Sequence, residues 1–237
     1  MKKLGFALVS MLSLVGCAGV EDATDVEVQA ELGSQSQGLG CAVAGDGKTT
    51  LRFINRCGTS VVFAGNGGMA GGTLAAGAEA CRTIGGNTEH MISRRYWGFR
   101  QGEDPGAGRY TLAEFGFNEN FMGNASWDWF DVSQVDAQNL PMKIIPYQLG
   151  TNTVCSGQTR ACQPNLLPGC PSVGQFKNSA GKIISCVSPE RDNPNSAVAK
   201  YFDSKCSQAY SWSGDDAGPM AACNAEDFDV VFCPLEP

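Results

Sequence analysis

Carboxylate side chains recur in one aromatic stretch, residues 110–142, which reads YTLAEFGFNENFMGNASWDWFDVSQVDAQNLPM. Glu114, Asp128, Asp131 and Asp136 stand inside or beside runs of aromatic and β-branched residues, a composition typical of strands. Burying a carboxylate is costly unless it has a partner, so several acids in strand-like sequence predict a polar cleft lined by strand residues. Carboxyl groups clustered in this way could supply the acid and the base of a hydrolytic reaction.

A simpler interpretation of the same acids is also open. Polar residues alternate with apolar ones along half-exposed strands, and these acids would then only face the solvent. Trp129 has the same strand parity as Asp131, so we expect both side chains on one side of the sheet. The indole could then offer a ring face beside the acids, although a large aromatic residue is also a candidate for the core.

Length, composition and charge exclude several classes of protein. The chain has 237 residues, 17% of them charged, with 30 glycines and a net charge of −7. This composition suits one large, loop-rich β-protein, and the negative charge argues against nucleic acid as a partner. His90 is the single histidine, which excludes a histidine-based metal cluster. We therefore expect no metal and no cofactor.

The amino terminus has the pattern of a targeting segment. Lys2 and Lys3 precede an apolar run that is too short for a mature membrane span and ends in Leu-Val-Gly-Cys. This resembles a bacterial lipobox, so residues 1–17 are predicted to be a signal peptide with Cys17 as the lipidated residue; the alternative is ordinary cleavage after Ala18. Residues 18–40 are small, polar and acidic, and are predicted to form a flexible tether. The protein would then be exported and anchored to a membrane through its lipid, or otherwise secreted.

The cysteine count agrees with export. Eleven cysteines are present, and assigning Cys17 to the lipid leaves ten, enough for five disulfides. Their spacings do not resemble paired zinc ligands, and disulfides persist in exported proteins.

The order of several motifs resembles the thaumatin-like proteins. TLAEF, WFDVSQVD and NLPM follow one another as in the centre of that family, with FINRC and RRYWG before them and QAYSWSGDDAG and FDVVFCP after them. The resemblance covers about residues 51–237. The family's cysteine-rich excursion after the Trp-Gly strand is replaced here by GFRQGEDPGAGR, which has no cysteine.

This resemblance implies an all-β fold: an antiparallel β-sandwich over 41–237, with a smaller loop-rich, disulfide-stapled lobe at about 151–206 that carries a short helix after Pro194-Asn195-Ser196. From the pattern alone, residues 49–55 and 60–64 are predicted to form a hairpin. The disulfides that the resemblance implies are Cys57–Cys233, Cys155–Cys223, Cys162–Cys206 and Cys170–Cys186, which leaves Cys41 and Cys81 for each other.

The resemblance also implies an acidic cleft of one arginine and four acids, between the sandwich and the lobe. The matching positions in this chain are Arg95, Glu114, Asp131, Asp136 and Asp215, with Asp128 and Asp216 as neighbours of lower rank.

Three functions remain open for such a cleft. It could bind a β-glucan-type polysaccharide through hydrogen bonds to sugar hydroxyls. It could hydrolyse β-1,3-glucan, with Glu114 as the acid and Asp131 as the base or nucleophile. It could also be a structural or protein-interaction domain in which Arg95 only neutralises the acids. We expect the protein to be a monomer, with polysaccharide and a membrane surface as its partners.

Overall fold

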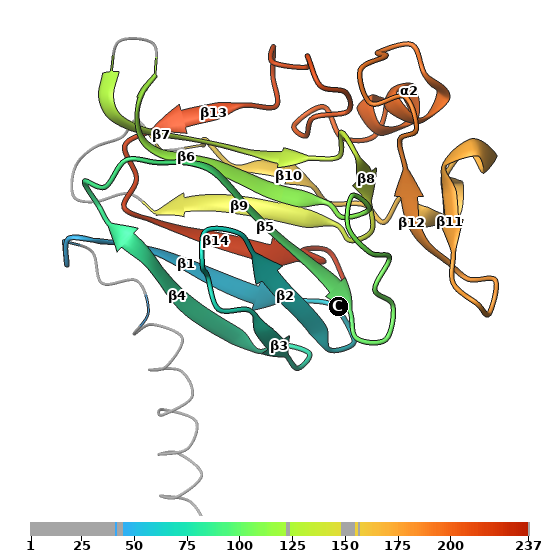
Figure 1. Cartoon of the computed structure of the whole chain (residues 1–237), viewed down its shortest axis with the longest axis horizontal. Coiled ribbons are helices and arrows are strands. Elements are labelled where there is room, and N and C mark those ends of the chain that lie inside the picture. The colour runs from blue at the N-terminus through green and yellow to red at the C-terminus, as the bar shows by residue number, and fades with distance from the viewer. Residues whose placement is uncertain (1–40, 42–44, 122–123, 148–154, 156, 237) are drawn as a thin grey trace, which may run out of the picture. The chain divides into compact units, whose positions relative to one another are not determined.

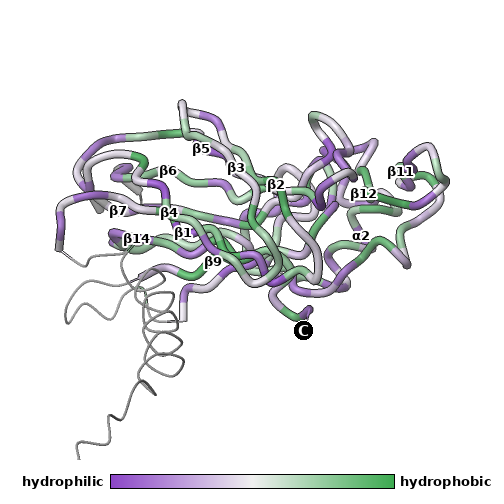
Figure 2. The backbone as a smooth tube through the Cα atoms, turned by 90° about the horizontal axis from the view of Figure 1, so that it is seen from below, coloured by the Kyte–Doolittle hydropathy of each residue, from purple (hydrophilic) through white to green (hydrophobic). Residues whose placement is uncertain are grey.

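Two β-sheets face each other in the part of the chain that the computed structural model describes, residues 41, 45–121, 124–147, 155 and 157–236. Figure 1 shows the strands, and Figure 2 shows β5 and β14 in different layers. The predicted signal peptide and tether lie outside the described residues. Among the described helices, none is long and apolar enough to cross a membrane.

Each sheet combines strands from distant parts of the chain. The six-stranded sheet has the order β13 (Ala221–Cys223), β7 (Asn124–Ser133), β6 (Leu112–Phe121), β5 (Met91–Arg100), β2 (Val61–Gly65) and β3 (Gly72–Leu74). The five-stranded sheet has the order β10 (Arg160–Cys162), β9 (Met142–Tyr147), β14 (Asp227–Phe232), β1 (Lys48–Asn55) and β4 (Glu79–Gly86). The predicted all-β sandwich is confirmed, and its pairs are antiparallel apart from β1 with β14.

The predicted hairpin of residues 49–55 and 60–64 is wrong. β1 pairs with β14 and β4, whereas β2 pairs with β3 and β5 in the other sheet. The alternation of apolar residues shows which face of a strand is buried, but it does not select the partner strand. Here Cys57 follows β1 and is joined to Cys233 just after β14, so the two strands are held side by side.

Aromatic rings fill the space between the sheets. Phe53 stacks on Phe63 with ring centroids 4.7 Å apart, and Phe115 meets Phe228 edge to face at 5.1 Å. These four side chains are at most 1% exposed. Burying one such side chain contributes on the order of 2–3 kcal/mol, so this inner layer is the main source of stability.

A smaller lobe comes mostly from the chain between β10 and β13. Its three-stranded sheet has the order β11 (Gln175–Lys177), β12 (Ile183–Val187) and β8 (Ala137–Gln138), next to the short helices η1 (Leu167–Gly169) and η2 (Ser172–Gly174). The predicted helix is α2 (Ala197–Asp203), and it begins after Ser196, whose side chain accepts a hydrogen bond from Ala199 N. The ten cysteines are joined as Cys41–Cys81, Cys57–Cys233, Cys155–Cys223, Cys162–Cys206 and Cys170–Cys186.

Candidate functional site

Three of the predicted cleft residues form one row across the outer face of the six-stranded sheet. Arg95 on β5 is the register partner of Glu114 on β6, and Glu114 is the register partner of Asp131 on β7. Arg95 Nε donates to Glu114 Oε1 at 2.9 Å. Alternate residues of a strand share a face, and the buried Phe115, Phe130 and Val132 occupy the opposite, inner face. The strand register therefore brings one guanidinium and two carboxyl groups together.

Asp131 is the most unusual member of this row. It is 5% exposed, and its Oδ1 atom has no hydrogen-bond partner. Burial raises the pKa of its carboxyl well above the usual range, and the nearby Glu114 raises it further, while Arg160 and Arg95 partly oppose the shift. A protonated, unpaired carboxyl facing a pocket can donate a hydrogen bond to a ligand or give up a proton.

A pocket of about 150 Å³ lies over this row. Asp136 reaches it from the chain just after β7, and its Oδ1 lies 2.9 Å from Arg191 Nε, which belongs to the loop before α2. The pocket is lined by polar and charged side chains with two aliphatic ones: Arg95, Leu112, Glu114, Asp131, Ser133, Val135, Asp136, Arg191, Tyr210 and Ser213. The rest of the wall thus comes from the chain on both sides of α2: Arg191 precedes the helix, and Tyr210 and Ser213 follow it.

Asp215 and Asp216 lie beside the pocket but are not among its lining residues. Asp215 Oδ2 accepts hydrogen bonds from the backbone and hydroxyl of Ser211, at 3.1 and 2.9 Å, so its carboxylate closes its own turn. Asp216 Oδ1 accepts from Tyr210 Oη at 2.9 Å. Four of the five predicted residues therefore meet in one pocket, and Asp215 supports the loop that carries Tyr210 and Ser213.

Asp128 takes no part in the pocket, because its strand parity places it on the inner side of β7. It is 3% exposed, and its carboxylate accepts the backbone N–H groups of Asn118 and Ala225, at 2.9 and 3.3 Å. Burial raises the pKa of this carboxyl to about 7, and the two backbone hydrogen bonds limit the rise. Asp128 fastens the irregular part of β6 to the turn before β14.

Trp129 is on the same side of the sheet as Asp131, as its parity predicts, and it is half-buried on the outer face. Its indole N–H donates to Glu119, and the ring occupies the space above Gly116, its register partner on β6. A Cβ atom at position 116 would lie 2.1 Å from Nε1 of the indole. The glycine thus allows the ring to lie over the sheet, one step along the strands from the acid row.

Arg191, Tyr210 and Ser213 are pocket residues that sequence reasoning missed. Arg191 stands in an undistinguished polar loop, PERDNPN, with no motif around it. Tyr210 belongs to the QAYSWSGDD motif, in which only the aspartates were assigned to the cleft. The described residues hold a single cluster with the geometry of a metal site, Cys57, Cys233 and Glu236, and both of its cysteines are already in a disulfide.

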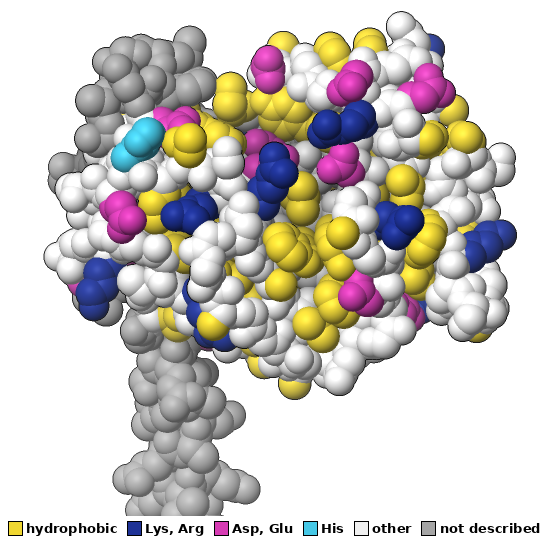
Figure 3. All heavy atoms as spheres, in the orientation of Figure 1, with side chains coloured by type: hydrophobic (Ala, Val, Ile, Leu, Met, Phe, Trp, Pro, Cys, Tyr) yellow, Lys and Arg dark blue, Asp and Glu magenta, His cyan; other side chains and the backbone are white. Residues whose placement is uncertain are grey.

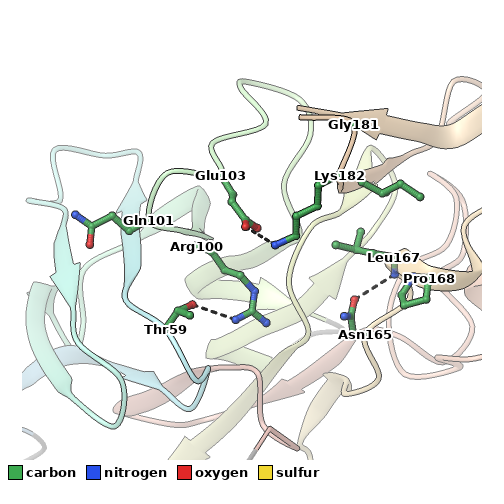
Figure 4. A pocket seen from close by; sticks show the side chains of 10 residues that line it. Thr59, Arg100, Gln101, Glu103, Asn165, Leu167, Pro168, Gly181 and Lys182 are labelled. Atoms are coloured by element: carbon green, nitrogen blue, oxygen red, sulfur yellow. Dashed lines mark hydrogen bonds and ion pairs between the residues drawn. The ribbon is translucent and has the colours of Figure 1, made fainter. Parts of the chain in front are cut away.

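A larger pocket, of about 570 Å³, lies between the end of β5 and the lobe (Figure 4). Glu103 and Lys182 point toward each other across it and form an ion pair, and Arg100 donates to Thr59 Oγ1 at 3.2 Å and pairs with Glu236. The charged side chains that line this larger pocket are therefore already in ion pairs. The smaller pocket, with the unpaired Asp131, is the better candidate site.

Comparison with known proteins agrees with the fold. A sequence model of the Thaumatin family matches residues 100–234. The chain belongs to the thaumatin family. The matched range includes Glu114, Asp131, Asp136 and Asp215, and Arg95 lies just before it.

Plant proteins are among the relatives of this thaumatin-family chain. A protein named glucan endo-1,3-beta-glucosidase from Prunus avium is 32% identical over 142 residues, which cover 52% of this chain and 55% of the relative. The pathogenesis-related 5 protein Cup a 3 from Hesperocyparis arizonica is 34% identical over 138 residues, covering 54% and 63%. Thaumatin-like protein 1 from Pyrus pyrifolia is 26% identical over 236 residues, covering 81% and 93%. The chain thus spans between half and two thirds of the first two relatives.

Proposed function

We propose that this thaumatin-family protein binds a β-glucan-type polysaccharide in the acidic pocket. The observation that carries the proposal is Asp131, a buried acid that lines the pocket beside Glu114 and Arg95 and whose Oδ1 has no hydrogen-bond partner. A buried polar atom without a partner is costly, and a sugar hydroxyl can both donate to and accept from a carboxyl group. The name of the Prunus avium relative supports a β-1,3-linked glucan as the first ligand to test.

Co-sedimentation with insoluble β-1,3-glucan tests this proposal. Glu114→Gln should weaken binding, because it removes the charge that holds Arg95 over the pocket. Glu103→Gln is the matched control, since both glutamates are in ion pairs and their side chains are 22% and 24% exposed. Equal binding by the two variants would contradict the assignment of the pocket.

Hydrolysis of the same glucan is the second candidate, favoured by the direct opposition of Glu114 and Asp131 across β6 and β7. Directly opposed residues have Cβ atoms about 4.5–5.5 Å apart, which allows their carboxyl groups to approach the separation of about 5–5.5 Å that retaining glycosidases use. The roles would be the reverse of those assigned from the sequence. Asp131, buried and unpaired, would be the protonated acid, and Glu114, in an ion pair, would be the ionised nucleophile.

Product analysis separates binding from hydrolysis. If the pocket is catalytic, wild-type protein releases reducing sugar with retained anomeric configuration, and both Glu114→Ala and Asp131→Ala abolish release. With an activated aryl glycoside as substrate, azide should then give a glycosyl azide of inverted configuration with Glu114→Ala, because azide attacks in place of the missing nucleophile. With Asp131→Ala the glycosyl azide should have retained configuration, because azide attacks the glycosyl-enzyme intermediate formed on Glu114. Binding without turnover supports the binding function alone. If the protein neither binds nor hydrolyses the glucan, a structural or protein-interaction role remains.

We also propose that the protein is exported, anchored through a lipid on Cys17, and works as a monomer on an acidic tether. The five disulfides of the described domain support an oxidising compartment. Mass spectrometry of the mature amino terminus provides the test. A diacylated or triacylated Cys17, lost in Cys17→Ser, would support the anchor, whereas a free amino terminus at Gly19 would contradict it.

A further inference from the structure

Three aromatic side chains follow one another on the outer face of the six-stranded sheet. Trp97 and Phe99 are alternate residues of β5, and Tyr110 comes just before β6. The ring centroid of Tyr110 is 5.7 Å from that of Trp97, at an interplanar angle of 17°, and 6.0 Å from that of Phe99, at 24°. All three side chains are half-buried. We call these three residues the aromatic strip.

The aromatic strip begins where the acidic pocket ends. Arg95, at one wall of the pocket, is followed two residues later on the same face of β5 by Trp97. Leu112, which also lines the pocket, lies between Glu114 and Tyr110 on the chain. Because alternate strand residues share a face and are about 7 Å apart, the strip extends the pocket along the strands. Figure 3 shows hydrophobic side chains gathered over the middle of the molecule, beside basic and acidic ones.

The strip does not belong to the core between the sheets. Tyr96 and Gly98 alternate with its members and face inward. Tyr96 is 1% exposed, and a Cβ atom at Gly98 would lie 2.8 Å from the ring of Phe232. On the neighbouring strand, the register partner of Trp97 is Ala64, whose small side chain leaves room beside the indole. The Tyr110 hydroxyl donates to Asp104 Oδ1 at 2.6 Å, which ties the ring to the loop after β5.

We propose that the aromatic strip provides further subsites for the polysaccharide chain whose one end occupies the acidic pocket. Aromatic rings pack against the apolar faces of sugar rings, while the Tyr110 hydroxyl and the Asp104 carboxylate at the rim can meet sugar hydroxyls. A protein partner fits less well, because a stable interface covers about 800 Å² on each partner and the strip has only three side chains. The inference rests on the proposed glucan binding and adds that affinity depends on chain length.

A ladder of linear β-1,3-gluco-oligosaccharides, from two to seven sugars, tests the strip by isothermal titration calorimetry. Wild-type affinity should rise with length beyond the sugars that fill the pocket. In Trp97→Ala/Phe99→Ala the heptamer should bind about ten-fold more weakly, as expected for the loss of two aromatic contacts, while the dimer is unchanged. Trp97→Phe, which retains a ring, should keep the length dependence of the wild-type protein. Val173→Ala, at an apolar side chain 63% exposed in η2, is the control.

The outcomes separate this inference from the proposed function. If the wild-type protein binds the oligosaccharides and the double variant shows the same dependence of affinity on chain length, the proposal for the strip is overturned and that for the pocket stands. Equal weakening of short and long oligosaccharides also overturns it, since the strip would then act only through the pocket's structure. No binding of any oligosaccharide by wild-type protein overturns both. Phe99→Thr, a β-forming replacement of a single ring, gives the same readout if the double variant fails to fold.

Discussion

Glu114 and Asp131 oppose each other on neighbouring antiparallel strands, and they differ in their partners. Glu114 accepts a hydrogen bond from Arg95, whereas Asp131 Oδ1 accepts none and is deeper in the sheet. Two like groups brought together in this way are pushed toward different protonation states, because mutual repulsion and burial act on the less solvated one. The pair therefore offers a hydrogen-bond donor beside an acceptor, an arrangement that suits the proposed binding and also acid–base chemistry.

Asp131→Asn should increase stability at pH 8. The amide resembles the protonated acid in shape and removes the cost of holding an unpaired, buried ionisable group, a gain of about 1–2 kcal/mol. The gain in the free energy of unfolding, measured in urea at pH 8, should disappear at pH 4, where the native carboxyl is protonated in any case. A variant less stable than wild type at pH 8 would show that the Asp131 carboxylate stabilises the fold.

The stability of the domain should rise as the pH falls from 8 to 5. Burial raises the pKa of Asp128 to about 7 and that of Asp227 to about 6, above their ordinary value of 3.8. The native state thus keeps protons that the unfolded state has released, and the stabilisation is complete below pH 3.8 and lost as the pH passes 6 and then 7. Thermal unfolding measured at intervals of half a pH unit gives the profile.

Asp128→Asn separates the contribution of this residue from the rest. It should flatten the profile between pH 6 and 7, where Asp227 is already ionised, and reduce the slope between pH 4 and 6, where both residues contribute. It should also lower stability overall, because one oxygen that accepts a backbone N–H is replaced by an amide nitrogen. A melting temperature that increases with pH across 6 to 8 in wild-type protein would contradict the prediction.

Loss of the Cys57–Cys233 disulfide should be more costly than loss of Cys170–Cys186. The first closes a loop with a sequence separation of 176 and the second one of 16. A longer closed loop restricts the unfolded chain more, so replacing both cysteines by serine should cost about 5 kcal/mol for the first pair and about 3 for the second. Denaturant unfolding of the two double variants measures the difference, and equal losses would show that local packing outweighs chain entropy.

Gly116→Ala should displace Trp129 from the sheet. The new methyl group would lie 2.1 Å from the indole Nε1, so the ring must move and lose its hydrogen bond to Glu119. We expect a change in tryptophan fluorescence and a loss of stability of about 1–3 kcal/mol from overpacking. Gly58→Ala is the control, because a Cβ atom there meets nothing within 4 Å. An unchanged spectrum in Gly116→Ala would contradict the observed position of the ring.

Much of the fold could be predicted from local patterns and ordered motifs. The strand at 49–55, the helix after Ser196 and the side of the sheet that carries Trp129 and Asp131 follow from periodicity and capping, which depend on near neighbours in the chain. The partner of β1 could not be predicted in this way. It comes from the far end of the chain, and its choice depends on long-range packing and on the Cys57–Cys233 disulfide.

The sequence by itself determined which acids were candidates, because their order along the chain matches a family pattern. Only the tertiary structure decided what each of them does. It joined Arg95, Glu114 and Asp131 by strand register, and it turned Asp128 inward and Asp215 toward Ser211. It also brought Arg191, which precedes α2, and Tyr210, which follows it, to the pocket. The physical reason is that the protonation and pairing of a carboxyl group depend on burial and on neighbours in space, which sequence spacing does not contain.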